Sequence, residues 1–261
     1  MIPKIIHYCW FGGNPLPELA KRCIASWRKF LPDYEIREWN EDNFDVNMIP
    51  YTAEAYRQKK FAFVSDYARF WIIYHYGGIY FDTDVEVIRP MDDIIAHGNF
   101  MGFEVDPDGE NTPGRYAPRY CFDVALGLGF GLSKEHPFMR KMMDYYADLE
   151  FNGGVMNPWL KTIVAYTTEA LMEEGLENKS GIQQVGDITV YPHEYFAPID
   201  VITGRLHITP KTYTIHRYMG SWDNNNGNLG FKELKRKLRN LVPEWVFYMN
   251  NRIKRSRFKV R

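Results

Sequence analysis

Two aspartates separated by one residue, Asp82 and Asp84, are the strongest candidates for chemistry in this chain of 261 residues. They follow a short apolar stretch, Ile79-Tyr80-Phe81, which is typical of a buried strand. In extended backbone, residues i and i+2 point the same way, so both carboxylates would face one site at the edge of a sheet. Carboxylate oxygens placed in this way suit a hard divalent cation that keeps several waters and also binds substrate phosphates.

An acid and a guanidinium precede this strand, in the segment from Phe61 to Tyr76. Apolar residues recur there at three- and four-residue spacing without a proline, which predicts a helix, and Gly77-Gly78 would end it. Asp66 and Arg69 are three residues apart, so they share one face of that helix. They could grip a polar ligand beside the two aspartates. The alternative is a surface ion pair, worth only about 0.3–0.5 kcal/mol.

These two stretches together resemble a known family. Ser65-Asp66-Tyr67-Ala68-Arg69, followed by Tyr76-Gly77-Gly78-Ile79-Tyr80-Phe81-Asp82-Thr83-Asp84, is similar to the DXD signature of a family of retaining glycosyltransferases. That family includes fungal initiating mannosyltransferases and bacterial capsule and lipopolysaccharide sugar transferases. The catalytic domains of the clostridial glucosylating toxins are more distantly similar. The resemblance implies a nucleotide-sugar-binding α/β sandwich of the GT-A type, with a central, mostly parallel sheet.

The resemblance extends to the segment from Thr214 to Trp222, in which a histidine at a predicted strand end precedes a Ser-Trp pair. It implies that Asp82, Asp84 and His216 bind Mn²⁺ or Mg²⁺, and that Asp66, Arg69, Asp82 and Asp84 are the catalytic residues. The residues implied to contact the donor are Trp10, which would stack on the base, with Asp66, Arg69, Tyr80, Asp82, Ser221 and Trp222.

The implied reaction moves a hexose from a nucleoside-diphosphate sugar to a glycan or lipid-linked glycan, with retention at the anomeric carbon. Among donors we expect a UDP-sugar in preference to a GDP-sugar. The implied setting is the synthesis of capsule, lipopolysaccharide or another surface polysaccharide.

Two other functions remain open from the sequence. A D-x-D pair also begins phosphotransferases of the haloacid dehalogenase type, in which Asp82 would be the nucleophile. In those enzymes the motif normally closes the first strand, whereas about 80 residues precede it here. A sugar-binding module without catalysis is the other alternative, and such a module would need neither His216 nor a metal.

The elements around these residues follow the pattern of a parallel α/β sheet. Strands are predicted at 4–10, 35–39 and 79–81, with helices at 16–30 and 61–76 between them. Later, we predict strands at 101–105, 188–192 and 194–198 and helices at 138–150 and 159–174. The segment 126–133 alternates glycine with apolar residues and predicts a strand whose backbone approaches a ligand closely. At Gly127 and Gly129 the sequence departs from the family, where polar residues are common.

The charge is unevenly distributed. The net charge is −1, but residues 231–261 carry 11 Lys and Arg against 2 Glu, so the rest of the chain is strongly acidic. A nucleic-acid binder would normally have its basic surface on the folded domain, so nucleic acid is not an expected partner. We expect a glycosyltransferase domain over 1–228 and basic helices over 229–261. That tail would either rest on an anionic membrane or pack on the domain.

Cysteine usage and hydropathy indicate the compartment. The three cysteines, Cys9, Cys23 and Cys121, lack C-x-x-C spacing, which favours a reducing environment over a disulfide frame or a zinc site. The first residues enter a predicted strand directly, so no signal peptide is expected. No apolar run approaches the roughly 18–20 residues that span a bilayer. The expected location is the cytoplasm, with the inner face of the cell membrane as a resting surface.

Overall fold

A computed structural model describes residues 1–107, 122–153, 162–200 and 203–220. The predicted donor contacts Ser221 and Trp222, and the whole predicted tail 229–261, lie outside these residues.

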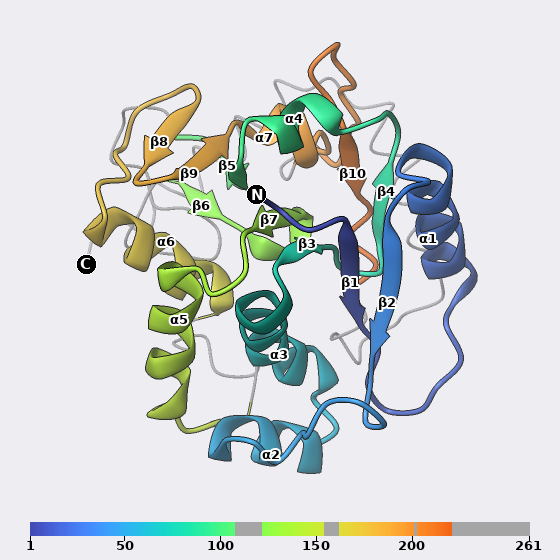
Figure 1. Cartoon of the computed structure of the whole chain (residues 1–261), viewed down its shortest axis with the longest axis vertical. Helices are drawn as coiled ribbons and strands as arrows, with labels where there is room; N and C mark the ends of the chain where they lie inside the picture. The colour runs from blue at the N-terminus through green and yellow to red at the C-terminus, as the bar shows by residue number, and fades with distance from the viewer. Residues whose placement is uncertain (108–121, 154–161, 201–202, 221–261) are drawn as a thin grey trace.

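One sheet of eight strands forms the centre of the molecule (Figure 1). Its strands lie in the order β2-β1-β3-β7-β5-β9-β8, and β6 pairs with β5. Five of them, β2, β1, β3, β5 and β9, run in one direction, because β7 is antiparallel to both of its neighbours. The predicted α/β class with a mostly parallel central sheet is therefore confirmed. The bounds are β1 Ile5–Cys9, β2 Glu35–Trp39, β3 Gly78–Tyr80, β5 Asn99–Val105, β6 Asp123–Val124, β7 Phe130–Leu132, β8 Gln183–Val185 and β9 Ile188–Tyr191.

A second, two-stranded sheet lies beside the first and is made from segments far apart in the chain. Strand β4 (Val85–Val87) pairs antiparallel with β10 (Thr214–His216), and His216 lies opposite Val85. This pairing brings the end of β10 next to the aspartates that immediately precede β4.

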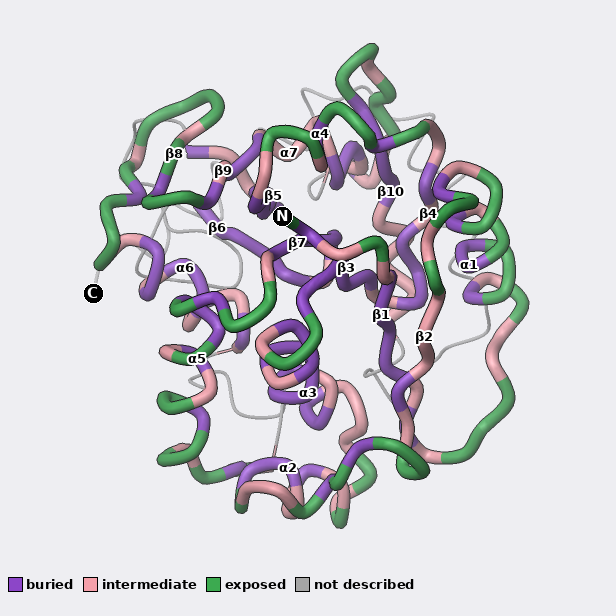
Figure 2. Tube along the Cα trace, viewed as in Figure 1, coloured by how far each residue is buried: buried purple, intermediate pink, exposed green. Residues whose placement is uncertain are grey.

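Two apolar cores cover the two faces of the central sheet. Along β3 and the residue that follows it, Tyr80 belongs to one core while Ile79 and Phe81 belong to the other, as expected from the alternation of side chains in extended backbone. The first core packs against α2, α3, α5 and α6, and the second against α1, α7 and the small sheet. Figure 2 shows the central strands buried, with exposed residues on the outer turns of α5. The helices are α1 Glu18–Phe30, α2 Pro50–Arg57, α3 Phe61–Tyr76, α4 Asp92–Ala96, α5 Pro137–Ala147, α6 Ile163–Glu173 and α7 His193–Phe196.

Helix α3 is buried around most of its circumference, which is why its sequence is apolar on more than one face. It ends where the Gly-Gly pair predicted, and Gly77 adopts φ +65°, a conformation that favours glycine. Burial extends to its polar residues: Asp66 is 9% exposed and Arg69 is 4% exposed. The alternative of a surface ion pair is therefore wrong.

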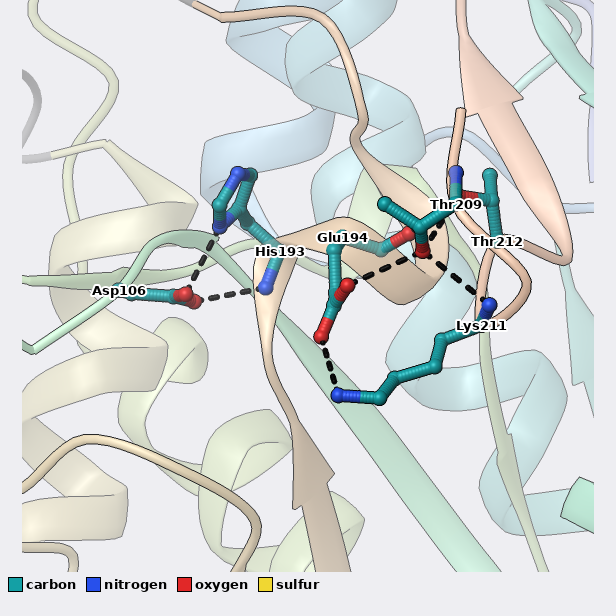
Figure 3. A network of polar contacts seen from close by, with 6 residues as sticks. All are labelled: Asp106, His193, Glu194, Thr209, Lys211 and Thr212. Atoms are coloured by element: carbon teal, nitrogen blue, oxygen red, sulfur yellow. Dashed lines mark hydrogen bonds and ion pairs between the residues drawn. The ribbon is translucent and has the colours of Figure 1, made fainter. Parts of the chain in front are cut away.

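One predicted strand is right only in its second half, and another is wrong. Residues Leu126–Leu128 form a 3₁₀ turn (η1) and only 130–132 pair in the sheet, because Gly129 turns the chain with φ +116°. The segment predicted as a strand at 194–198 contains the short helix α7. Its first amide, His193 N, donates to Asp106 Oδ1 at 2.6 Å, and Pro192 precedes it as the N-cap (Figure 3). The Asp106 side chain thus satisfies the first amide of this helix, a contact that the β-type residues of 194–198 do not reveal.

Within the residues that the structure describes, no helix combines the length and the apolar character needed to cross a bilayer.

Candidate active site

The two aspartates of the motif lie where β3 ends and β4 begins. After Tyr80 the chain leaves the central sheet, and Phe81 N donates to His7 O at 3.0 Å. Asp82 O then accepts from Val85 N at 3.0 Å, which closes a turn around the motif. The turn places Asp82 and Asp84 between the large sheet and the small one.

The structure brings Asp82, Asp84 and His216 together. One ligand atom from each of them lies within 4.8 Å of the other two. His216 Nε2 is 3.1 Å from Asp84 Oδ1, and Asp84 Oδ2 accepts a hydrogen bond from Met219 N at 2.7 Å. Burial alone would lower the pKa of His216, but the neighbouring Asp84 carboxylate raises that pKa to about 9. Reciprocally, although burial opposes it, His216 lowers the pKa of Asp84.

This set of groups fits a divalent cation. Two carboxylates and one imidazole offer oxygen and nitrogen ligands, a combination that suits Mn²⁺ somewhat better than Mg²⁺. A bound cation would take the place of the proton that His216 shares with Asp84, because a metal ligand must be a neutral imidazole. Asp82 is the most open of the three, with 32% of its side chain exposed, so substrate could reach the cluster from its side.

Arg69 joins the helix acid to the motif. Its Nη2 atom lies 3.3 Å from Asp66 Oδ1 and 3.4 Å from Asp82 Oδ1. Its Nε donates to Ser65 O at 3.1 Å, and its guanidinium carbon lies 4.8 Å from the centre of the Tyr80 ring. The guanidinium is thus held from several sides, as expected of a group that presents donors in a fixed direction.

Burial changes the acidity of the two carboxylates beside Arg69. It raises the pKa of Asp66 to about 7, even though Arg69 acts in the opposite direction. Burial also raises the pKa of Asp82, again against the effect of Arg69. Titratable groups shifted in this way gather at functional sites more often than elsewhere.

The other predicted donor contacts occupy different positions. Trp10 directly follows β1, the neighbour of β3, and is only partly buried; its Nε1 donates to Asn14 O at 2.6 Å. Tyr80 is 1% exposed and lies against the Arg69 guanidinium. In this arrangement Tyr80 supports Arg69 from within the core, whereas Trp10 retains a surface that a ligand can reach.

Two further residues lie next to this cluster: Gly127, which the sequence placed in a segment close to a ligand but without a role toward Asp82, and Glu104, which the sequence did not indicate. Gly127, in η1, accepts from Asp82 N through its carbonyl at 3.3 Å. Glu104 is a buried carboxylate near the end of β5, where the pairing with β6 shifts register, and it contributes to the raised pKa of His216. A charged residue inside the apolar stretch 99–105 was the available signal for Glu104, because charged groups are seldom buried without a partner or a role.

Comparison with known proteins bears directly on this geometry. Residues 17–101 match the family described as "Glycosyltransferase sugar-binding region containing DXD motif". The match runs from the start of α1 into β5 and includes Asp66, Arg69, Asp82 and Asp84. The resemblance to DXD glycosyltransferases is confirmed.

Individual proteins are also similar to parts of this chain. The chain is 30% identical over 119 residues to inositol phosphoceramide mannosyltransferase 1 of Schizosaccharomyces pombe, covering 41% of this chain and 36% of that protein. It is 24% identical over 280 residues to the initiation-specific alpha-1,6-mannosyltransferase of Candida albicans, covering 84% of this chain and 72% of the relative. The chain thus spans about a third of the first relative and nearly three quarters of the second. The solved "PaToxG Glycosyltransferase" matches 67% of this chain and 70% of its own, with 19% identity and a TM-score of 0.45.

Proposed function

We propose that this protein is a metal-dependent, retaining glycosyltransferase that moves a hexose from a nucleoside-diphosphate sugar to an acceptor hydroxyl. One observation carries the proposal: within a region that matches the DXD glycosyltransferases, Arg69 contacts both Asp66 and Asp82, while Asp84 and His216 lie beside Asp82. The expected retention at the anomeric carbon follows from the family resemblance.

The chemistry requires loss of a nucleoside diphosphate, so negative charge develops on the leaving oxygen. A divalent cation held by Asp84, His216 and, directly or through water, Asp82 would neutralise that charge when bound. The protein's own contribution is to hold the donor sugar. Arg69 would donate to the sugar hydroxyls from its rigid fork, and Asp66 would accept from them in its ionised form.

Asp66 also limits the pH range of binding. With its pKa raised to about 7 by burial, Asp66 is partly protonated near neutrality. A protonated carboxyl accepts less well and donates instead, so donor binding through an ionised Asp66 should improve as the pH rises through this range.

For both the donor and the acceptor, we propose a first candidate and a second one. We expected a UDP-sugar from the sequence, yet the two relatives described above are named as mannosyltransferases, so GDP-mannose is now the first donor to test. As acceptor we propose a lipid-linked or surface glycan, of the kind assembled into capsule or lipopolysaccharide. The name of one relative contains inositol phosphoceramide, which adds glycosylated sphingolipids as a second acceptor class.

A donor screen tests this proposal. The full chain is incubated with GDP-mannose, UDP-glucose, UDP-galactose or UDP-N-acetylglucosamine, with Mn²⁺, Mg²⁺ or EDTA, and nucleoside diphosphate release is measured. We expect release from one donor only when metal is present. Release of phosphate from simple phosphoesters instead would favour a phosphotransferase with Asp82 as nucleophile. Glycan binding that needs neither metal nor nucleotide would favour a binding module.

We also propose that the enzyme works in the cytoplasm on the inner face of the cell membrane, held there by its basic end. Support comes from the sequence alone: residues 231–261 carry 11 Lys and Arg against 2 Glu. Each basic residue near an anionic membrane contributes about 1 kcal/mol, and salt screens this attraction. Flotation of the full chain, and of a chain ending at Asn228, with anionic liposomes at low and high salt tests the idea. Equal flotation of both proteins would exclude a membrane role for the tail.

A further inference from the structure

Gly127 contacts both the backbone and the side chain of Asp82. Its carbonyl oxygen accepts from Asp82 N at 3.3 Å. A Cβ atom built on Gly127 would lie 2.3 Å from Asp82 Oδ2, 3.2 Å from Asp82 Cγ and 3.8 Å from Arg69 Nη1. The carboxylate of Asp82 therefore occupies the space that any side chain at position 127 would fill.

The conformation of Gly127 does not itself require glycine. Its φ lies outside the left-handed region, unlike that of Gly129, whose φ is +116°. An alanine at 127 could keep the same backbone, so the obstacle is the carboxylate alone. Because ordinary contact begins near 3.4 Å, Asp82 Oδ2 would have to move by about 1 Å to admit a Cβ atom.

Such a movement would disturb the contacts that join the two halves of the site. Asp82 Oδ1 lies 3.4 Å from Arg69 Nη2, within ion-pair distance but long for a hydrogen bond. On its other side the carboxylate lies within 4.8 Å of the ligand atoms of Asp84 and His216. A shift of the carboxylate away from Gly127 therefore changes its distances to both partners.

We propose that Gly127 is a positioning residue: the space left by its missing side chain keeps the Asp82 carboxylate between Arg69 and the Asp84–His216 pair. The placement of Asp82 stands on the geometry, and its effect on turnover rests on the proposed glycosyltransferase function. Near a reacting centre, a displacement of about 1 Å can cost about 100-fold in rate.

The test compares Gly127→Ala in two backgrounds, the wild type and Asp82→Ala, in the full chain. Thermal unfolding is measured without metal. We expect Gly127→Ala to lower the Tm of the wild type, because the Arg69–Asp82 contact is strained or lost. In Asp82→Ala nothing fills the space, so the same substitution should leave the Tm unchanged or raise it, as alanine restricts the unfolded chain. An equal Tm change in both backgrounds would overturn the proposal.

Metal binding gives a second readout that does not need activity. Free Mn²⁺ measured by EPR should show at least a 10-fold weaker affinity in Gly127→Ala than in the wild type. The control is Gly131→Ala on β7, where a Cβ atom would meet Phe100 Cε1 at 2.5 Å in the apolar core. It should lower the Tm equally in both backgrounds without changing Mn²⁺ affinity. Unchanged Mn²⁺ affinity in Gly127→Ala would contradict the proposed position of Asp82.

Two further outcomes are informative. If Gly127→Ala does not fold but Gly127→Ala with Asp82→Ala does, the rescue supports the proposal; if neither folds, the proposal fails. If no nucleotide sugar is cleaved by the wild type, the proposed function fails, yet the Tm comparison and the Mn²⁺ affinities still decide the role of Gly127. Where a donor is found, kcat/KM of Gly127→Ala should fall about 100-fold.

Discussion

At the scale of single residues, the site depends on charges that are costly to bury. Asp66, Arg69 and Asp84 are all less than a tenth exposed, and each needs a partner to offset its desolvation. Asp66 and Arg69 could be placed from their spacing along one helix, whereas Asp82 and Asp84, expected in extended backbone, lie in the turn between β3 and β4. The role of Gly127 could not be predicted, since its importance comes from what its missing side chain leaves free, and composition does not reveal that.

Asp66→Asn should separate a donor-binding role from a structural one. We expect a large fall in kcat/KM, of at least about 10-fold, because the amide cannot replace an ionised acceptor for a sugar hydroxyl. The free energy of unfolding should change little, since Arg69 keeps its contact with Asp82. Steady-state kinetics and urea unfolding check both points.

The matched control for Asp66→Asn is Glu54→Gln, which removes an acid from the exposed i,i+3 pair with Arg57 on α2. It should leave turnover unchanged. Wild-type turnover in Asp66→Asn would remove Asp66 from the proposed site.

His7 should stay neutral far below the usual pKa of histidine. In the interior of β1, Trp39 Nε1 donates to His7 Nδ1 at 3.0 Å, and His7 Nε2 lies 2.9 Å from Gly77 O. Burial lowers the pKa of His7 to about 4. Because the folded pKa lies below the unfolded value of about 6.5, the stability contributed by a neutral His7 is complete above pH 6.5. It is lost as the pH falls towards 4, at a cost of up to about 3 kcal/mol.

An NMR titration of the His7 ring checks this prediction. Its resonances should move near pH 4 and remain constant between pH 5.5 and 8. A midpoint near 6.5 would mean that the ring is not held in the way described.

At the scale of elements, the site is assembled by three pieces of backbone. Helix α3 supplies Asp66 and Arg69, the turn after β3 supplies the two aspartates, and β10 supplies His216. The first two follow each other in the sequence, so local periodicity predicts them. The pairing of β10 with β4 joins residues about 130 positions apart, and no local pattern encodes it. Only the family resemblance connected His216 with the motif.

The short helix α7 is tied to the end of β5 by a pair that should respond to pH. Asp106 accepts from His193 N at 2.6 Å and lies 2.8 Å from His193 Nδ1 (Figure 3). The hydrogen bond to Asp106 raises the pKa of His193, against burial and with smaller contributions from Glu194 and Asp200. Since the folded pKa is raised, the pair stabilises the protein fully below pH 6.5 and loses its charged component as the pH rises through the folded pKa.

Asp106→Asn should therefore destabilise the protein more at pH 5.5 than at pH 9. The charged component of a pair this exposed is worth about 0.5–1 kcal/mol. Urea unfolding of both proteins at the two pH values measures it. The control is Glu54→Gln, which breaks the exposed contact with Arg57 on α2. Its effect should be the same at both pH values, because Glu and Arg stay charged throughout, and a constant difference for Asp106→Asn as well would contradict the prediction.

At the scale of the whole molecule, the fold class was accessible from sequence and the strand order was not. Alternating strands and helices over the first 85 residues predict a parallel sheet, since each crossover returns the chain in the same direction. The insertion of the antiparallel β7 between β3 and β5 depends on contacts between segments about 50 and 30 residues apart. The same insertion brings η1, and with it Gly127, next to Asp82 at the end of β3. The contact between Gly127 and Asp82 therefore depends on strand pairings that the sequence does not predict.

The central claim is that a divalent cation held by Asp82, Asp84 and His216 supports sugar transfer. The most direct measurement uses the donor that the screen selects: the full-length protein is stripped with EDTA and turnover is followed as Mn²⁺ is added back, for the wild type, Asp84→Ala and His216→Ala. We predict no turnover in EDTA, saturable recovery in the wild type, no recovery in Asp84→Ala, and recovery in His216→Ala only at much higher Mn²⁺, by at least about 10-fold. Full turnover in EDTA, or identical Mn²⁺ curves for the three proteins, would contradict the claim.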